Sequence, residues 1–515
     1  MTTIDNIFTL SGYYINYFLG VDDIVSNYST FFKQVQRTPE DIFIYSGEKS
    51  LTYKEVFESS LKLANHFHQH GISKDTRVVV MLPNIPEMIY TWLALSRLEA
   101  MMIPVNINYK SLALRYIIDD SSAVSVIYHA DNEEDVLNAT NILTGLNVFI
   151  GIGDCKNEAT IDFIKYTEKP LFGGPYNPDA NDTNVMFYSG AATGPAKYAK
   201  YSNSQLFRNT NDYLSAVMLK HNDVIFSQFS LAHFIGYISV MNAVVNAGAS
   251  IAICNTDNED EVKKTLEISQ ANYMVAEPAY IAYLNKKNDK AFLPESIRYA
   301  ITGGGRLKKD IHETFTSIYK IPVFKIYGMV EAGPILTVNT NTDKPTSIGT
   351  TLSNVTIALK KGDVMLTEEV IGEICVVSNI LTEDLHKLLS DKFHNGWYHT
   401  GDLGRLDMDG YLYFVDRKAY VINVRGFDVY PEQVEIALMK HPKIRDVVVK
   451  GTPKDSYSES IHAYIIQEEG KRPTDDELIA FLEKELLRYQ IPEKFIYVNH
   501  FPKSPTGKVV RQALK

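Results

Sequence analysis

The chain has 515 residues, of which 45% are hydrophobic and 22% are charged, a composition typical of a soluble globular protein with about three or four structural units. Its formal net charge of −11 argues against a nucleic-acid-binding protein, whose surface would be basic. Three cysteines, an odd number at wide spacing, predict neither a disulfide framework nor a metal site, and they suit a reducing cytoplasm.

No segment of the sequence indicates export or a membrane span. Asp5 stands among the first residues, which lack the basic region and apolar core of a signal peptide. The most apolar long stretch, residues 88–105, is interrupted by Arg97 and Glu99, so it is not expected to cross a bilayer. We therefore expect a cytoplasmic protein with no membrane span and no nucleic-acid partner.

The first part of the chain alternates between helical and strand patterns. Apolar residues recur at helical spacing over residues 52–71 and 86–99, and a β-branched run covers residues 77–82. Further short apolar strands are predicted at residues 101–105, 124–128, 148–152, 224–229, 250–254, 273–276, 299–302 and 323–327. Short strands that alternate with helices predict βαβ units and parallel sheets.

From about residue 345 the pattern changes to short strands with turn signals. Residues 373–377 predict a strand, and residues 403–415 predict a hairpin that turns at Asp409-Gly410. Towards the C-terminus the sequence predicts strands at 421–424, 444–450 and 462–467 and helices at 431–439 and 475–487. The predicted class is α/β, with a large N-terminal domain of βαβ subdomains plus a small β-rich subdomain at about 345–415, and a small α+β C-terminal domain.

A loop rich in glycine and alanine follows the apolar pair Val185-Met186. It contains Thr193, Gly194 and Lys197. After a strand, such a loop can present successive backbone N–H groups to an anion, and the hydroxyl and ammonium groups suit phosphate. No Gly-Lys-Ser/Thr closes the loop, so it is not a P-loop, and a mobile surface loop is the alternative.

Two later segments place candidate residues near predicted strand ends. Gly303, Gly304 and Gly305 directly follow the strand at 299–302, where open α/β sheets bind ligands and glycine permits close approach to the backbone. His233 stands in an apolar segment, where a satisfied core histidine is the usual alternative to a catalytic one.

Four more residue groups are candidates for ligand contacts. Tyr327, followed by Gly328, could stack on a planar base, and Glu331 could hold a hard cation such as Mg²⁺. Asp402 stands in a tight glycine turn and could accept two ribose hydroxyls, with Arg417 further along. Taken singly, each is more often a solvated charge or a turn cap.

Lys508 follows a turn rich in proline, threonine and glycine near the end of the sequence. A lysine on such a loop is a movable point charge that suits an oxyanion or a phosphate. A solvated tail residue is the alternative for a lysine in this position.

These features occur in one order that resembles the acyl-adenylate-forming superfamily of acyl-CoA synthetases, peptide-synthetase adenylation domains and luciferases. The similarity covers nearly the whole chain, from Leu51-Thr52-Tyr53 through Pro83-Asn84 and Val105-Asn106 to Lys508. Its most specific part is Trp397 with Thr400-Gly401-Asp402-Leu403-Gly404, then Asp416-Arg417, then Gly507-Lys508. The chain is most similar to a free-standing bacterial-type acyl-CoA synthetase.

The resemblance implies an AMP-forming ligase that uses ATP, Mg²⁺ and coenzyme A. A carboxylate attacks the α-phosphate of ATP to give acyl-AMP and pyrophosphate, and a thiol then displaces AMP to form a thioester. Such a reaction needs neutralised phosphate charge and exclusion of water from the mixed anhydride. A small-molecule carboxylic acid is the implied partner, and a homodimer is compatible with the resemblance.

The resemblance also implies the role of each motif residue. The implied ATP contacts are Thr193, Gly194 and Lys197 for the β- and γ-phosphates, Gly304, Gly305, Tyr327 and Gly328 for adenine, and Asp402 and Arg417 for ribose. The implied catalytic residues are Lys508 between carboxylate and α-phosphate, Glu331 on Mg²⁺, and His233 at the acyl and thiol entrance. The domains would be 1–415 and 416–515, with a hinge near 416–419 that brings Arg425, Gly426 and Phe427 towards the pantetheine.

Several positions depart from the family pattern. Ala191 and Ala192 replace hydroxyl residues of the phosphate loop, and Val330 replaces a threonine. Losing one charge-assisted hydrogen bond to phosphate would cost about 1.5–3 kcal/mol. The other departures are Ala196, Tyr198, Arg306 and Ala419.

Three hypotheses follow for the activity. The leading one is an acyl-CoA synthetase acting on a fatty acid, because no charged residue indicates recognition of a second carboxylate or an amine. The second is an adenylation enzyme that loads a carrier protein, or an aryl or dicarboxylic acid ligase. The third is a degenerate homologue that binds ligands with weak or no adenylation.

Overall fold

The computed structural model describes residues 26–141, 146, 148–174, 176, 178–179, 181–188, 198–254, 258–362, 364–366, 370–378, 380–381, 392–454, 458–504 and 508–514. The chain divides into two compact units, Met1–Val355 with Ser378–Leu389 and Thr356–Val377 with Ser390–Lys515. Each unit has its own sheets and hydrophobic core. The predicted α/β class is confirmed.

The division into units differs from the predicted domain boundary. The second unit joins the β-rich segment to the C-terminal module, whereas the sequence predicts that they are separated by a hinge near 416–419. The contacts of a single conformation do not test whether the C-terminal module rotates about residues 416–419. The domain bounds 1–415 and 416–515 therefore stay a prediction.

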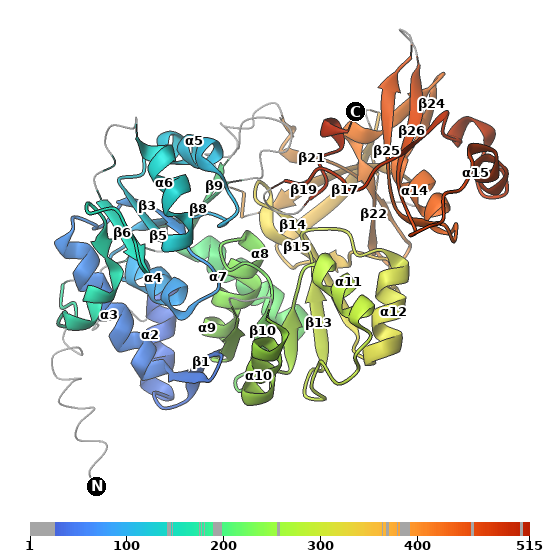
Figure 1. Ribbon diagram of the computed structural model, residues 1–515. Coiled ribbons are helices and arrows are strands. Elements are labelled where there is room, and N and C mark those ends of the chain that lie inside the picture. Colours follow the sequence, from blue (N-terminus) through green and yellow to red (C-terminus); the bar gives the residue numbers. More distant parts are fainter. Residues whose placement is uncertain are drawn as a thin grey trace. The chain divides into compact units, whose positions relative to one another are not determined.

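A seven-stranded sheet lies in the N-terminal part of the first unit, with strand order β7-β6-β5-β3-β4-β8-β9 (Figure 1). Its strands are β3 (Arg77–Met81), β4 (Met101–Pro104), β5 (Ser125–His129), β6 (Val148–Ile152), β7 (Ile161–Asp162), β8 (Thr183–Tyr188) and β9 (Tyr198–Ser202). All pairings are parallel except the antiparallel β8–β9 pair. The predicted βαβ pattern is confirmed here, and the β8–β9 pair was not predicted.

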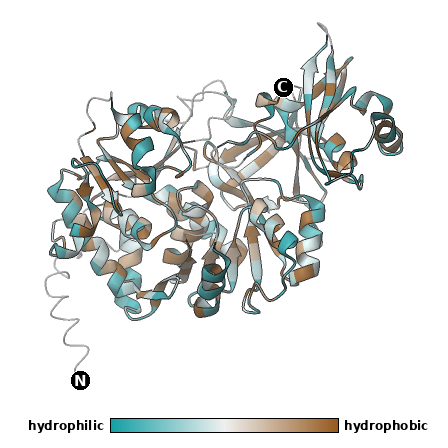
Figure 2. Ribbon diagram, in the orientation of Figure 1, coloured by the Kyte–Doolittle hydropathy of each residue, from teal (hydrophilic) through white to brown (hydrophobic). Residues whose placement is uncertain are grey.

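Local signals explain where the helices of this region begin. They are α2 (Asn27–Arg37), α3 (Tyr53–Gln69), α4 (Pro86–Arg97), α5 (Ser111–Ser121), α6 (Glu133–Thr140) and α7 (Asn203–Val217). Thr52 and Glu55 form a capping box before α3, and Pro86 is the first residue of α4. Most of these helices carry hydrophilic residues along one side and hydrophobic residues along another (Figure 2), as expected for helices that cover a buried sheet.

The second sheet of this unit has nine strands in the order β16-β15-β14-β13-β12-β10-β11-β1-β2. They are β1 (Ile42–Ser46), β2 (Lys49–Thr52), β10 (Val224–Ser227), β11 (Ser250–Ile253), β12 (Tyr273–Val275), β13 (Tyr299–Thr302), β14 (Val323–Met329), β15 (Gly333–Asn339) and β16 (Thr350–Thr351). The strands from β1 through β11, β10, β12, β13 to β14 are parallel. Their carboxyl ends therefore meet along one edge of the sheet.

The helical segments between these strands are α8 (Phe234–Gly236), a π-helical turn (Tyr237–Asn242), α9 (Ala243–Ala247), α10 (Glu259–Ser269), α11 (Pro278–Lys287) and α12 (Lys309–Tyr319). One core cluster packs α10, α11 and α12 against β10, β12, β13 and β14. Among the described residues, no helix is long and apolar enough to cross a bilayer.

The described residues of the second unit form three sheets. The six-stranded sheet comprises β17 (Val355–Lys361), β18 (Val364–Leu366), β19 (Gly372–Ser378), β20 (Phe393–His394), β21 (Trp397–Leu406) and β22 (Leu412–Arg417). The others are the β23 (Ile422–Val424) and β24 (Phe427–Val429) hairpin, and a sheet of β25 (Ile444–Pro453), β26 (Glu459–Gln467) and β27 (Lys494–Tyr497). Helices α14 (Pro431–Met439) and α15 (Asp475–Leu482) pack on this last sheet. The predicted helix 475–487 thus ends at Leu482.

Candidate active site

A loop at the carboxyl end of β10 is held in place by a distant asparagine. Asn84 donates through Nδ2 to the Phe229 carbonyl at 2.8 Å, and its Oδ1 accepts from the Leu231 N–H at 2.9 Å. The two bonds join residues about 145 positions apart. This clamp sets the backbone that leads into His233.

The structure brings His233 and the glycine triplet together. Gly304 has φ +70°, and a Cβ there would lie 3.2 Å from Phe229 Cζ, 3.1 Å from Ile235 Cδ1 and 3.6 Å from His233 Cε1. The His233 ring also lies tilted beside the Phe234 ring, with centroids 4.4 Å apart, and its Nδ1 accepts from the Ile235 N–H at 3.2 Å. His233 therefore caps a helical turn and faces the end of β13.

Gly328 has a structural reason to be glycine. A Cβ at Gly328 would lie 2.0 Å from the Pro334 carbonyl oxygen on the neighbouring strand β15. The pairing of β14 with β15 shifts register between Tyr327 and Met329, so the backbone bulges at this point. At Gly305, by contrast, the nearest atom to a Cβ is 3.6 Å away on Pro278. Adenine contacts by Gly304, Gly305, Tyr327 and Gly328 stay predictions.

Glu331 lies in the turn between β14 and β15, next to a buried tyrosine of the other sheet. The Tyr201 hydroxyl donates to the Val330 carbonyl at 2.6 Å, and Tyr201 is fully buried. Burial, with a smaller contribution from the Glu331 charge, raises the pKa of Tyr201 above its usual range. The hydroxyl therefore remains protonated and fixes the residue before Glu331.

Tyr201 belongs to β9, which directly follows the predicted phosphate loop. Thr193, Gly194 and Lys197 lie outside the described residues, so their predicted phosphate contacts stay predictions. The strands that flank them are described: Tyr188 and Tyr198 pair across β8 and β9 with ring centroids 5.7 Å apart. The flanking hairpin and the Glu331 turn are thus joined through Tyr201.

The surroundings of Glu331 fit a magnesium ion that is bound mainly by substrate. The described part of the chain contains no group of three or more histidine, cysteine or acidic side chains that could hold a metal. Mg²⁺ commonly takes one or two carboxylates together with water and substrate phosphates. Glu331 supplies one carboxylate next to Val330, whose carbonyl Tyr201 holds, and its role on Mg²⁺ stays a prediction.

In the second unit, Asp402 and Arg417 form an ion pair. Arg417 Nε lies 2.9 Å from Asp402 Oδ1, and the two residues are directly opposite each other on β21 and β22. The Asp402 side chain is only 3% exposed, whereas that of Arg417 is 56% exposed. The structure places these two candidate residues in contact, and their contact with ribose stays a prediction.

The segment after Arg417 is tied to both of its flanks. Asp416 Oδ2 accepts from the Glu432 N–H at 3.1 Å, at the start of α14, and Lys418 Nζ lies 2.8 Å from Glu373 Oε2 on β19. The residue before Arg417 thus binds the C-terminal module, and the residue after it binds the six-stranded sheet.

Arg425 and Gly426 form the turn of the β23–β24 hairpin, and Phe427 begins β24. Arg425 and Gly426 have φ values of 53° and 88°, the backbone of a tight hairpin turn with two left-handed residues. Phe427 is 57% exposed and stacks on Tyr489, with ring centroids 4.8 Å apart. The hairpin presents these residues at the surface, and their approach to pantetheine stays a prediction.

Lys508 lies at the end of a short antiparallel bridge. Its N–H donates to Ser504 Oγ at 3.2 Å, and its carbonyl accepts from the Ser504 N–H at 2.8 Å. Lys503 and Val509 form the antiparallel bridge, and Val509 packs against a small core. The lysine is exposed and anchored through its backbone, unlike a solvated tail residue.

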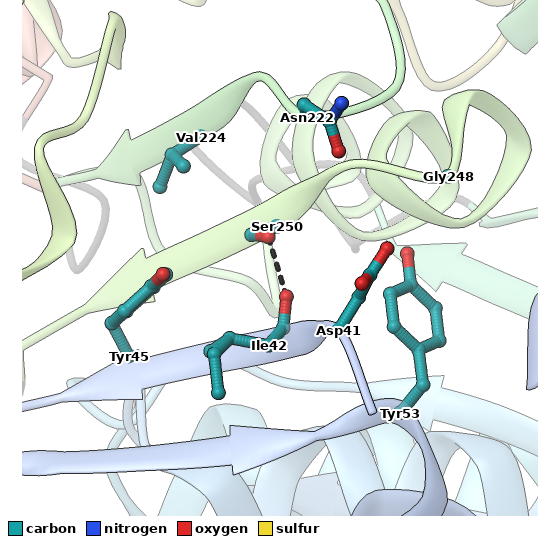
Figure 3. Close-up of a pocket in the computed structure, with 8 residues that line it drawn as sticks. All are labelled: Asp41, Ile42, Tyr45, Tyr53, Asn222, Val224, Gly248 and Ser250. Carbon is teal, nitrogen blue, oxygen red and sulfur yellow. Dashed lines mark hydrogen bonds between the residues drawn. The ribbon is translucent and has the colours of Figure 1, made fainter. Parts of the chain in front are cut away.

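A cavity of about 200 Å³ in the first unit lies away from these residues. Figure 3 shows its lining, which includes Asp41, Tyr53, Val224 and Ser250. Val224 and Ser250 begin β10 and β11, so the cavity is at the amino ends of strands whose carboxyl ends carry His233. It is not the candidate site.

Two positioning residues were not predicted from the sequence. Asn84 was noted only as part of the family resemblance, and Tyr201 was not singled out. Their partners are 145 and 129 residues away, so no local pattern indicates these contacts.

Comparisons with known proteins identify the family. The model of AMP-binding enzymes matches residues 31–383, and that of the AMP-binding enzyme C-terminal domain matches residues 433–508. The chain is 25% identical to a long-chain-fatty-acid–CoA ligase of Bacillus subtilis, with 93% of this chain and 92% of the relative covered. It is 26% identical to a 2-succinylbenzoate–CoA ligase of Bacillus velezensis, with 94% and 96% covered.

Solved structures share the fold. The o-succinylbenzoate CoA synthetase MenE of Bacillus subtilis with its acyl-adenylate intermediate has a TM-score of 0.83 at 22% identity, covering 95% of this chain and 98% of that one. The anthranilate CoA ligase AuaEII with anthranoyl-AMP has a TM-score of 0.85 at 18% identity, covering 95% and 96%. The chain therefore belongs to the AMP-binding enzyme family, which confirms the predicted acyl-adenylate-forming superfamily and its class of AMP-forming ligases.

Proposed function

We propose that this protein is an ATP-dependent acid–CoA ligase that works through an acyl-adenylate. The carboxylate oxygen of the acid attacks the α-phosphorus of ATP and expels pyrophosphate. The CoA sulfur then attacks the acyl carbon, loses its proton, and displaces AMP, which keeps the bridging oxygen. The named relatives act on such acids, and this activity fits the cytoplasmic location that we predict.

One observation supports the proposal most strongly. The Tyr201–Val330 hydrogen bond joins β9, which follows the phosphate-loop segment, to the turn that carries Glu331. A phosphate-binding loop and a metal-binding carboxylate must lie close together to act on one triphosphate. In our proposal Glu331 holds Mg²⁺, which would offset phosphate charge, while Thr193, Gly194 and Lys197 hold the β- and γ-phosphates.

The remaining residues have proposed roles in binding and transfer. Asp402 accepts from the ribose hydroxyls, oriented by its ion pair with Arg417. Lys508 neutralises the carboxylate and α-phosphate as they approach, a charge that counts most in a site closed to water. Arg425 to Phe427 meet the pantetheine arm after the C-terminal module rotates about residues 416–419.

We propose a fatty acid as the acid. The side chains that face Gly304 are apolar or aromatic: Phe229, Ile235 and His233. Aryl acids are the second candidate, because the named relatives and structural neighbours include 2-succinylbenzoate and anthranilate ligases. A stacked ring would suit Phe229 and His233, whose centroids are 5.1 Å apart.

Pyrophosphate release from ATP tests the proposal. It should be measured across a panel of fatty, aryl and dicarboxylic acids, with and without CoA. Acid-dependent release that CoA stimulates supports the ligase, and the preferred acid decides between fatty and aryl substrates. Release without CoA stimulation but with loading of a carrier protein would support the carrier-loading alternative. No release with any acid would overturn the proposal and favour a degenerate homologue.

A further inference from the structure

A basic pocket of about 230 Å³ lies in the second unit, outside the residues proposed for catalysis. Its lining residues come from β17, β19, β21, the region of β20 and the turn after β22; they are Lys360, Glu373, Lys392, His394, His399, Gly401 and Lys418. Three lysines face one carboxylate, in a chain whose formal net charge is −11. The described lining includes neither Asp402 nor Arg417, so the pocket is distinct from the proposed ribose contacts.

The single carboxylate of the pocket is already satisfied within the protein. Glu373 Oε2 lies 2.8 Å from Lys418 Nζ and 3.4 Å from His399 Nδ1, and Oε1 accepts from the Gly401 N–H at 3.2 Å. Burial alone would raise the pKa of Glu373, but Lys418 and His399 outweigh it and hold the pKa below its usual value. Glu373 therefore stays ionised, and its charge is matched by Lys418.

The other two lysines have no such partner. Among the described residues, neither the Lys360 nor the Lys392 ammonium makes an ion pair or a hydrogen bond, although both side chains are partly buried. Lys392 Nζ lies 5.7 Å from the centre of the Tyr398 ring, a weak interaction at best for an ammonium. Lys360 is near enough to His399 to contribute to its lowered pKa, after the larger effect of burial.

Two partly buried ammonium groups that make no ion pair among the described residues favour an anion in the pocket. Lysine ammonium groups act as point charges that suit phosphate oxygens, and several of them in one hollow match a multivalent anion better than a single carboxylate. His394 stands edge-on to His399, with ring centroids 5.0 Å apart, and adds a donor at the exposed rim.

We propose that this pocket binds a phosphate-bearing anion, either a free oligophosphate or the phosphate groups of a nucleotide, with Lys360 and Lys392 as its principal ligands. None of its lining residues is among those that we propose to contact ATP, the acid or CoA. Lys418 links the pocket to the segment that follows Arg417, so an occupied pocket includes a residue of the predicted hinge.

Isothermal titration of the full chain with tripolyphosphate tests this proposal. The test variant is Lys360→Gln/Lys392→Gln, and the control is Lys361→Gln/Lys320→Gln, which removes the same charge from two exposed lysines outside the pocket. We expect wild type and control to bind alike and the pocket variant to lose at least tenfold in affinity for one site. Equal binding by all three proteins would overturn the proposal.

A charge-preserving variant guards against misfolding. Lys360→Arg/Lys392→Arg should restore most of the affinity, and the thermal midpoint of each variant without ligand should match wild type. Replacing tripolyphosphate with adenosine 3′,5′-bisphosphate separates the two sources of phosphate: lysine-dependent binding of the bisphosphate assigns a nucleotide, and binding of tripolyphosphate alone assigns a free oligophosphate.

Discussion

The hydrogen bond from Tyr201 to Val330 offers a sharp test of how the phosphate-loop hairpin positions Glu331. Tyr201→Phe removes one hydroxyl from a fully buried side chain and leaves the Val330 carbonyl without that donor. An unsatisfied buried carbonyl costs about 1–3 kcal/mol, so the free energy of unfolding should fall by that amount. The turn that carries Glu331 should also become less well fixed.

A matched control exists elsewhere in the same unit. The Tyr53 hydroxyl donates to the Ala249 carbonyl at 2.6 Å, the same distance as in the Tyr201 bond, and Tyr53 is 1% exposed. It lines the cavity at the amino ends of the strands (Figure 3), away from the candidate site. Tyr53→Phe should therefore cost similar stability without changing catalysis.

Two assays separate stability from function. Urea unfolding should show comparable losses for both variants, while acid-dependent pyrophosphate release as a function of Mg²⁺ concentration should distinguish them. We expect Tyr201→Phe to raise the half-saturating Mg²⁺ concentration and to lower kcat about tenfold or more, because a small misplacement of a catalytic group has effects of this size. Identical kinetics for the two variants would refute the argument that Tyr201 positions Glu331.

Three further predictions concern individual residues. Burial and the charge of Arg306 lower the pKa of Lys325 to about 8. Between about pH 8 and 10.5 the folded state therefore binds fewer protons than the unfolded state, so the free energy of unfolding of wild type relative to Lys325→Met should rise by up to about 3 kcal/mol across that window, measured by urea unfolding. A difference between the two proteins that does not change with pH would contradict the lowered pKa of Lys325. Gly328→Ala should lower the thermal midpoint by the equivalent of about 1–3 kcal/mol, because its Cβ would lie 2.0 Å from a carbonyl oxygen. Gly305→Ala, the control, should leave the thermal midpoint nearly unchanged. Equal thermal midpoints for the two variants would contradict the packing described at Gly328. Asp402→Asn should raise the KM for ATP about tenfold through weaker ribose binding, measured by pyrophosphate release, and an unchanged KM would remove Asp402 from the nucleotide site.

Features that depend on local pattern were predictable from the sequence. The helical spacing over residues 52–71 and the strand pattern at 299–302 have counterparts in α3 and β13, because periodicity and capping signals are written in neighbouring residues. The sequence predicted a hairpin over residues 403–415, which Asp402 and Arg417 flank, and the family resemblance gave both residues a role at the ribose. Their ion pair was not predicted.

Contacts between distant residues were not predictable in the same way. The Asn84 clamp, the Tyr201 bond and the Lys418–Glu373 pair join residues that no short pattern connects. Gly328 illustrates a related limit: the sequence indicated a ligand contact, while the structure shows that the Pro334 carbonyl alone already excludes a side chain. Such a requirement appears only when the register of β14 and β15 is known.

The central claim, that the protein joins an acid to CoA through an acyl-adenylate, is tested most directly by isotope transfer. The preferred acid is labelled with ¹⁸O in both carboxylate oxygens and converted to the thioester in the presence of ATP, Mg²⁺ and CoA. The nucleotide product is then analysed by mass spectrometry. The account predicts AMP that carries one ¹⁸O atom, because the attacking carboxylate oxygen stays on the phosphorus. AMP without label, or label in inorganic phosphate with ADP as the product, would contradict it.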